Sequence, residues 1–282
     1  MLFLVLSVLL QAAPASQVRS VPVSVVDDKG APVTGLTAEE VALLENGVVR
    51  DVTRLQADRR PLTVAVVVDS TQEITSEFRL FLVDAVTEFL KGLPEGTRYS
   101  LWLTGDRPQK IVDFTDDAAQ GARALRRAIT TGGNTLLDAI VLASREIREV
   151  KAKEDQRTAV VVVSGITTSV ASRDRYRSLE ESQDNADVFL SVQFGEGGGS
   201  FEDRTDYDFV LGGLAKRSGG LRETPVSVMG VGVILRRAAG ELSAQYRISY
   251  ATLPDLKERK LELRVARPGV KVRVGAGDAP SS

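Results

Sequence analysis

The chain has 282 residues, of which 43% are hydrophobic and 26% charged, and its 36 basic and 38 acidic residues leave a net charge of −2. This length accommodates one medium domain with an appendage, or two small domains. The balanced charge argues against a nucleic-acid partner, which normally requires a basic excess or stripe. Cysteine and histidine are both absent. Their absence excludes thiol nucleophiles, disulfides, zinc sites with the usual ligands and the commonest general base.

The N-terminal segment has the pattern of an export signal. Leu2–Leu10 is apolar but too short to span a bilayer, and Ala13 and Ala15 match the small-residue cleavage pattern. We predict a signal peptide over residues 1–15, cleaved after Ala15; an uncleaved N-terminal anchor is the alternative. No second hydrophobic span follows. We therefore expect an exported protein, periplasmic or extracellular, with no integral membrane span in the mature chain.

Residues 18–58 form a first segment rich in β-strand patterns. Valine recurs at every second position from Val21 to Val25, which is the spacing of one strand face. Asn46-Gly47 lies between two apolar runs and predicts a hairpin, with Val48–Val52 as its second strand.

The centre of the chain, residues 61–243, has the pattern of an α/β domain. Leu62–Val68 is a continuous apolar run, typical of a parallel strand buried on both faces. Further strands are predicted at 98–104, 110–114, 158–163 and 188–192, and helices at 76–91, 116–130, 136–151, 172–185, 208–218 and 226–242. A short turn joins the strands 98–104 and 110–114, which makes them antiparallel neighbours. This order predicts a doubly wound, mostly parallel sheet with one antiparallel edge hairpin.

The C-terminal segment, residues 244–275, returns to strand patterns, and 276–282 has the composition of a disordered tail. The two β segments, 18–58 and 244–275, are each too short to fold alone. Because the termini of a domain often lie close together, we expect these segments to pack together as a small β appendage.

A polar loop follows the buried strand at its carboxyl end. It reads Asp69-Ser70-Thr71-Gln72-Glu73. Ligands of open α/β sheets bind at the carboxyl ends of the strands. This loop is therefore the first candidate for a binding site.

Several motifs together resemble the von Willebrand factor A-like domain, in its exported bacterial VWFA-related subfamily. They are Val64–Asp69 with the hydroxyl-bearing loop after it, Gly132–Ile140, Leu214–Gly220, and the flanks Pro32–Glu40 and Arg267–Arg273. The resemblance implies a doubly wound fold that binds other proteins rather than a catalyst.

Domains of this family typically hold a divalent cation at a metal-ion-dependent adhesion site. Its first loop reads Asp-x-Ser-x-Ser, a second loop supplies a threonine, and the loop after a later strand supplies an aspartate. Mg²⁺ favours such oxygen ligands in an octahedron. By resemblance, Asp69 matches the first acid and Thr71 matches the first serine.

Other positions depart from this family pattern. Glu73 stands in place of the second serine, Asn134 in place of the threonine with Thr135 one residue later, and Ser164 in place of the later aspartate. The resemblance implies Mg²⁺ or Mn²⁺ on Asp69, Thr71, Glu73, Asn134 and Thr135, with Ser70, Gln72 and Ser164 contacting a partner. The alternative is a vestigial polar loop without a cofactor.

Three functions remain open from the sequence. The first is an exported protein-binding module of adhesion or scaffold type, with a partner whose identity the sequence does not give. The second is a structural subunit of an envelope assembly that uses no metal. The third is a phosphatase-like hydrolase with Asp69 as nucleophile. That chemistry needs a second acid two residues later, where Thr71 stands, and the chain has no Gly-x-Ser-x-Gly motif. We therefore expect no enzymatic activity.

Overall fold

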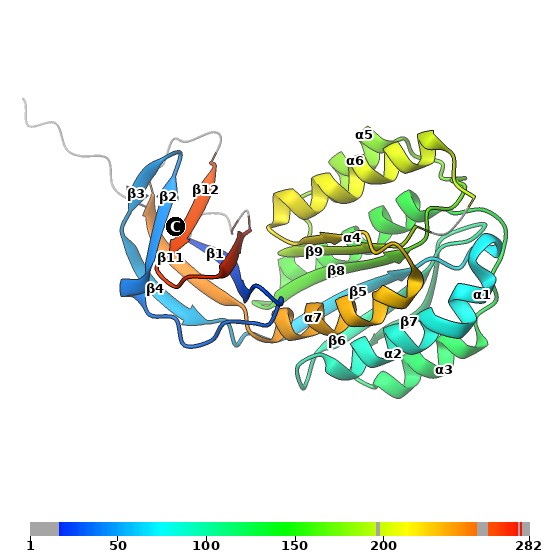
Figure 1. Ribbon diagram of the computed structural model, residues 1–282, viewed down its shortest axis with the longest axis horizontal. Helices are drawn as coiled ribbons and strands as arrows, with labels where there is room; N and C mark the ends of the chain where they lie inside the picture. Colours follow the sequence, from blue (N-terminus) through cyan, green and yellow to red (C-terminus); the bar gives the residue numbers. More distant parts are fainter. Residues whose placement is uncertain (1–16, 196–197, 253–258, 276, 278–282) are drawn as a thin grey trace, which may run out of the picture.

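The computed structural model describes residues 17–195, 198–252, 259–275 and 277. In this part the chain forms an α/β unit and an antiparallel β sandwich, which lie side by side (Figure 1). The signal peptide predicted over residues 1–15 lies outside the described residues, as does the predicted tail apart from residue 277. None of the described helices has both the length and the apolar composition needed to cross a membrane.

The α/β unit is built on a six-stranded sheet with the order β10-β9-β8-β5-β6-β7. The strands are β5 (Leu62–Val68), β6 (Arg98–Leu103), β7 (Gln109–Thr115), β8 (Arg157–Ser164), β9 (Val188–Gln193) and β10 (Leu221–Glu223). Central β5 pairs in parallel with β6 and β8, and β7 runs antiparallel to β6 at one edge. All residues of β5 and β8 are buried, as their apolar runs predict. The predicted doubly wound sheet with an edge hairpin is confirmed.

Helices cover both faces of this sheet (Figure 1). One layer consists of α2 (Val83–Gly92), α3 (Ala118–Arg127) and α7 (Val231–Ser243), and the other of α4 (Leu136–Lys153), α5 (Arg175–Ser182) and α6 (Phe201–Ser218). Successive side chains of a strand point to opposite faces. Val64, Val66 and Val68 therefore join the core under the first layer, while Ala65 and Val67 join the core under the second.

Short turns precede two of these helices. The helix α1 (Thr75–Glu77) and the π turn η3 (Phe78–Leu82) lead into α2, and η4 (Val228–Gly230) leads into α7. The 3₁₀ turn η2 (Gln72–Ile74) follows β5 directly.

The β sandwich joins the two ends of the described chain. One sheet has the order β13-β1-β11-β4 and the other the order β12-β2-β3. The strands are β1 (Gln17–Asp27), β2 (Val41–Glu45), β3 (Val48–Arg50), β4 (Val52–Ala57), β11 (Tyr246–Thr252), β12 (Leu261–Val265) and β13 (Val270–Val274), with the turn η1 (Ala38–Glu40) before β2. Because β1 pairs with both β11 and β13, the N- and C-terminal segments share one sheet. The expected β appendage is confirmed.

Several predicted elements differ from the structure, and one strand was not predicted. The strand predicted over Val48–Val52 is divided at Asp51, where the chain passes from β3 in one sheet to β4 in the other. The helix predicted from residue 208 begins at Phe201, because Ser200 and Asp203 form a capping box there. Strand β10 was not predicted, since its three residues are too few to show a periodic pattern.

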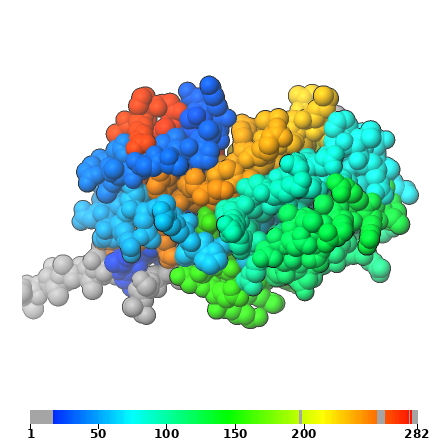
Figure 2. All heavy atoms as spheres, turned by 90° about the horizontal axis from the view of Figure 1, so that it is seen from below, coloured from blue at the N-terminus to red at the C-terminus, as the bar shows by residue number. Residues whose placement is uncertain are grey.

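The sandwich and the α/β unit meet closely at the end of α6. Gly219 ends α6 in the left-handed conformation with φ 62°, and a Cβ atom there would lie 2.3 Å from the carbonyl of Val274. Next to Val274, Gly275 N–H donates to Pro22 O at 2.9 Å. On another side of the molecule, α7 lies between the sandwich and α2 (Figure 2). Helix α6 and strand β13 therefore approach one another through backbone rather than side chains.

This contact makes Gly219→Ala a test of how the two parts are joined. Alanine at a left-handed position costs about 1–2 kcal/mol by itself, and the clash with Val274 should add roughly 1–3 kcal/mol. Gly35→Ala is the matched control, because Gly35 also has a positive φ of 68° but has open space around its Cβ position. We expect urea unfolding to show a clearly larger loss of stability for Gly219→Ala. Equal losses in the two variants would contradict the close packing.

Candidate functional site

Asp69 lies at the carboxyl end of β5, where three loops meet. The first is its own loop, residues 69–74; the second, residues 131–135, precedes α4; and the third, residues 164–170, follows β8. Asp69 extends the sheet by one further hydrogen bond, from its N–H to Val163 O at 2.8 Å. Its side chain is fully buried.

The Asp69 carboxylate is surrounded by hydrogen-bond donors from all three loops. Its Oδ1 accepts from Thr71 N–H at 3.0 Å. Its Oδ2 lies within hydrogen-bonding distance of four groups: Asn134 Nδ2 (3.0 Å), Gly165 N–H (3.1 Å), Thr167 Oγ1 (3.1 Å) and Ser164 Oγ (3.2 Å). A carboxylate oxygen has two lone pairs. The hydrogen-bonding capacity of Oδ2 is therefore filled by the protein itself.

Backbone hydrogen bonds also hold the loops together. Thr131 N–H donates to Ser70 O at 2.9 Å, and Gln72 N–H donates to Gly132 O at 3.3 Å. Asn134 exchanges backbone hydrogen bonds with the third loop, from its N–H to Thr168 O and from Val170 N–H to its carbonyl oxygen, both at 2.9 Å. The second loop is thus bonded to both of its neighbours.

Burial and hydrogen bonding act in opposite directions on Asp69. Removal from water disfavours the charged carboxylate and raises the pKa of Asp69, while the N–H groups of Thr71 and Gly165 favour the charged form and lower it. Burial is the larger effect, so the pKa lies above its ordinary value. The hydrogen bonds from these donors offset the cost of burying a carboxylate at this position.

Three buried oxygen atoms in the same loops have no hydrogen-bond partner among the described residues. They are Thr71 Oγ1, Asn134 Oδ1 and Thr135 Oγ1. Thr135 is the residue before α4, and its hydroxyl does not cap that helix. Buried oxygens of this kind normally bind water or an ion.

Glu73 is directed toward other loops. Its Oε1 accepts from Thr168 N–H at 3.0 Å, and its Oε2 accepts from Gly198 N–H at 2.6 Å. Desolvation would raise the pKa of Glu73, but these hydrogen bonds outweigh it and the pKa is lowered. Glu73 therefore ties the first loop to the connections after β8 and β9.

The residues around Asp69 do not fit a tightly held divalent cation. Asp69 is the single carboxylate in its hydrogen-bond network, and in the part of the chain that the structure describes no group of three or more acidic side chains is placed to hold a metal ion. Asn134 directs its amide N–H₂, a donor, at Asp69 Oδ2. A hard cation needs several oxygen ligands with free lone pairs. The three unpartnered oxygens and Asp69 Oδ1, which accepts one hydrogen bond, meet that requirement, and the Asp69 carboxylate is the single charged group among them.

The residues predicted to contact a partner differ in exposure. Gln72 is exposed and available to a partner. Ser70 and Ser164 are buried, with exposed fractions of 1% and 0%. Ser70 N–H donates to Thr104 Oγ1 at 3.3 Å, and the Ser164 hydroxyl also lies 2.6 Å from Gly165 O. Direct contact with a partner does not fit the burial of these two serines, which instead pack the site from within.

Thr167 was not among the site residues predicted from the sequence. Its buried hydroxyl donates to Asp69 and accepts from Asn134 Nδ2 at 2.8 Å, so it links the third loop to the other two. The available signal was its place three residues after the end of a fully buried strand, in the hydroxyl-rich stretch Ser164–Ser169. Like the loop after β5, this stretch lies at the carboxyl end of a buried strand, where ligands of α/β sheets bind.

A set of exposed apolar side chains lies in the connections around these loops, and we call it the rim. It consists of Ile129, Val170, Phe201, Val226 and Met229. Phe201 and Val226 are the most exposed, at 82% and 92%. Val170 lies against Gly133 in the second loop, and the Val226 backbone lies near Gly195 after β9. The rim is thus spread over the connections at the same edge of the sheet as Asp69.

Thr167→Val tests whether Asp69 is the charged centre of this network. The change removes a hydroxyl that donates to a buried carboxylate, and such hydrogen bonds contribute about 1.5–3 kcal/mol. The matched control is Thr87→Val, because the buried Thr87 hydroxyl donates to a neutral carbonyl, Val83 O, at 2.6 Å. We expect Thr167→Val to lower the free energy of unfolding by about 2 kcal/mol and the control by under about 1 kcal/mol. Equal losses in urea unfolding would show that the carboxylate is not the anchor.

Comparison with known proteins identifies the α/β unit. Residues 64–166 match the family model of the von Willebrand factor type A domain. A von Willebrand factor type A structure from Catenulispora acidiphila superimposes with a TM-score of 0.55 at 9% identity, covering 91% of this chain and 72% of that one. Proximal thread matrix protein 1 from the mussel byssus gives a TM-score of 0.50 at 12% identity, covering 71% of this chain and half (50%) of that one. At these identities the likeness shows the fold, and no curated protein matches the sequence. Residues 64–166 thus match the von Willebrand factor type A domain family, and the α/β unit that contains them shares the fold of such a domain.

Proposed function

We propose that this chain is an exported, non-catalytic protein-binding module of adhesion or scaffold type, which binds its partner through the rim and Gln72. In this proposal residues 61–243 form the binding domain, and residues 18–58 and 244–275 form its β appendage. Export rests on the signal peptide proposed for residues 1–15, and residues 276–282 are proposed to form a tail.

The observation that carries the proposal is the exposure of the rim. Large apolar side chains that face water together mark surfaces that other proteins cover. Phe201 and Val226 are almost fully exposed, although Phe201 begins α6, whose start is held by the capping box of Ser200 and Asp203. The loops beneath them are already ordered by Asp69 and Glu73. A partner would therefore bind without first ordering this surface, which lowers the entropic cost of association.

We further propose that the metal-ion-dependent adhesion site is degenerate. Asn134, Ser164 and Thr167 supply Asp69 with hydrogen-bond donors in the place where the family pattern expects ligands or charge for a cation. If Mg²⁺ or Mn²⁺ binds at all, its ligands would be Asp69 Oδ1 and the unpartnered oxygens of Thr71, Asn134 and Thr135. Partner binding in this proposal does not depend on that cation.

Catalysis by Asp69 does not suit its surroundings. A nucleophilic carboxylate must reach its substrate, whereas the Asp69 side chain is fully buried and one of its oxygens is enclosed by donors. We therefore propose a structural role for Asp69 rather than a phosphatase-like one.

Capture of partners from envelope extracts tests the proposal. The test variant is the double change Phe201→Ser and Val226→Ser, and its matched control is Val48→Ser and Val49→Ser at the exposed tip of the β2–β3 hairpin. We expect the rim variant to lose at least about 90% of the captured partner, since truncating apolar anchors costs over about 1.4 kcal/mol, a factor of ten. The control should bind as the wild type does, and a chelator should change neither result.

Two outcomes would contradict this function. Unchanged capture by the rim variant would place the partner elsewhere and favour a structural subunit. Loss of capture with chelator in the wild type would show that a metal takes part.

A further inference from the structure

A second candidate site lies at the opposite end of the sheet from Asp69, where the chain passes between the sandwich and the α/β unit. A cavity of about 400 Å³ is lined there by residues 58–62, by the turn 94–97 before β6, and by Arg157 and Ser243. These residues lie at the amino ends of β5, β6 and β8 and at the end of α7. Junctions between structural units are common positions for ligand sites.

Arg157 is the buried charge in the wall of this cavity. It is 6% exposed, and its guanidinium donates from Nε to Arg60 O at 3.0 Å and from Nη1 to Leu242 O at 2.6 Å. Both acceptors are neutral carbonyls, and Nη2 makes no hydrogen bond to a described residue. A guanidinium has five N–H donors in a planar fork. Arg157 therefore has unused donors and no carboxylate hydrogen-bonded to it.

The nearest acid does not neutralise Arg157 by direct contact. Both oxygens of buried Asp58 are bonded by Arg60, at 3.0 Å from Nε and 2.7 Å from Nη2. Burial lowers the pKa of Arg157, and the charge of Asp58 only partly opposes this. Arg59, also in the lining, is exposed and forms no ion pair with any residue in the described ranges. Two guanidinium groups of this cavity thus have no carboxylate hydrogen-bonded to them, and Glu95, an exposed acid in the turn 94–97, also belongs to the lining.

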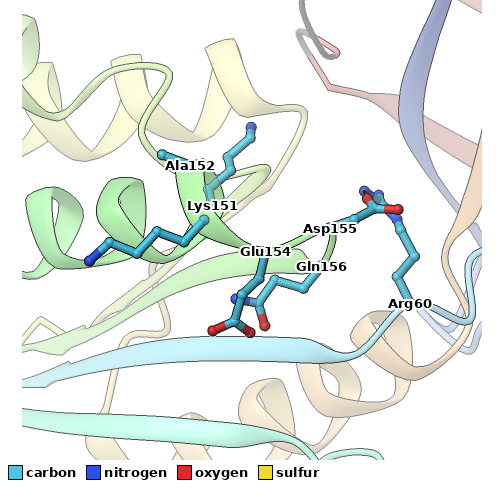
Figure 3. Close-up of a pocket in the computed structure, with 7 residues that line it drawn as sticks. Arg60, Lys151, Ala152, Glu154, Asp155 and Gln156 are labelled. Carbon is cyan, nitrogen blue, oxygen red and sulfur yellow. Dashed lines mark hydrogen bonds and ion pairs between the residues drawn. The ribbon is translucent and has the colours of Figure 1, made fainter.

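A neighbouring cavity of about 270 Å³ shows the contrast. Arg60 and residues 151–156 line it, and Figure 3 shows the Arg60 side chain reaching toward Asp155. Arg60 pairs with Asp155 at 3.1 Å, Lys151 with Asp187 at 2.5 Å, and Glu154 with Arg98 at 2.8 Å. Apart from the exposed Lys153, its charges are compensated within the protein, so we assign no ligand to it.

We propose that the 400 Å³ cavity binds a small oxyanion, a phosphate or carboxylate group, with Arg157 at its inner wall and Arg59 at its mouth. Planar guanidinium groups bind both kinds of oxyanion through paired hydrogen bonds. The same Arg157 side chain holds the connection before β5 through Arg60 O and the end of α7 through Leu242 O. An anion that fixes this side chain also stiffens the two connections between the sandwich and the α/β unit.

The test is a thermal-unfolding titration of the full chain with inorganic phosphate and, separately, with acetate, against sodium chloride of equal ionic strength. We expect at least one of the two anions to raise Tm in a saturable way, because a ligand that binds the folded state stabilises it. The anion with the lower Kd identifies the chemistry of the ligand. Arg59→Ala should weaken the binding at least threefold, and Arg157→Lys, which keeps the charge but loses the fork, at least tenfold.

Arg107→Ala is the matched control, because Arg107 is an exposed arginine of the β6–β7 turn at the other end of the sheet. It should bind the anion as the wild type does. If the buried Arg157→Lys variant does not fold, the Kd of Arg59→Ala still tests the proposal. No effect beyond that of sodium chloride, or equal Kd values for Arg59→Ala and Arg107→Ala, would overturn the proposal. None of these outcomes bears on partner binding at the rim.

Discussion

The loops at the carboxyl edge of the central sheet depend on one buried carboxylate, that of Asp69. Burying a charge without partners costs far more than a folded domain can offset. At Asp69 the cost is offset by donors that come from three separate loops. Each loop must be in place for the carboxylate to be satisfied, and the carboxylate in turn fixes each loop. Charge-assisted hydrogen bonds of this kind are stronger than neutral ones, so the Asp69 side chain binds the three loops firmly to one another.

In the proposed degenerate site, hydrogen-bond donors of the protein take the role that a cation has in the family pattern. In the family pattern, loops at this edge are drawn together by a metal ion that bridges oxygen ligands. Here Asn134 and Thr167 direct donors at Asp69, and Glu73 bonds the backbone of the loops after β8 and β9. The loops around Asp69 are thus ordered by hydrogen bonds within the protein. In the function proposed above, the apolar rim is the main source of affinity, which is consistent with the exposure of Phe201 and Val226.

The sequence predicts the sheet better than the site, and the reason lies in the range of the interactions. The strands β5 and β8 are fully buried, and their continuous apolar residues are enough to predict this. The family motif also places Asp69 correctly at the end of β5. By contrast, the direction of the Glu73 side chain is decided by Thr168 and Gly198, which are distant in the chain.

Other differences between the prediction and the structure also arise from contacts between residues that are distant in the chain. The burial of Ser70 and Ser164 follows from how the loops stack, and the division between β3 and β4 follows from the sandwich having two sheets. Local patterns do not contain this information. The start of α6 is the exception, because the capping pair Ser200 and Asp203 could have been found in the sequence.

Calorimetric titration of the wild type with Mg²⁺ and Mn²⁺ tests whether donors from the three loops, rather than a metal ion, hold the Asp69 carboxylate. We expect no heat of binding at millimolar Mg²⁺ or Mn²⁺, either for the wild type or for Asp69→Asn. Stoichiometric binding by the wild type that disappears in Asp69→Asn would contradict it.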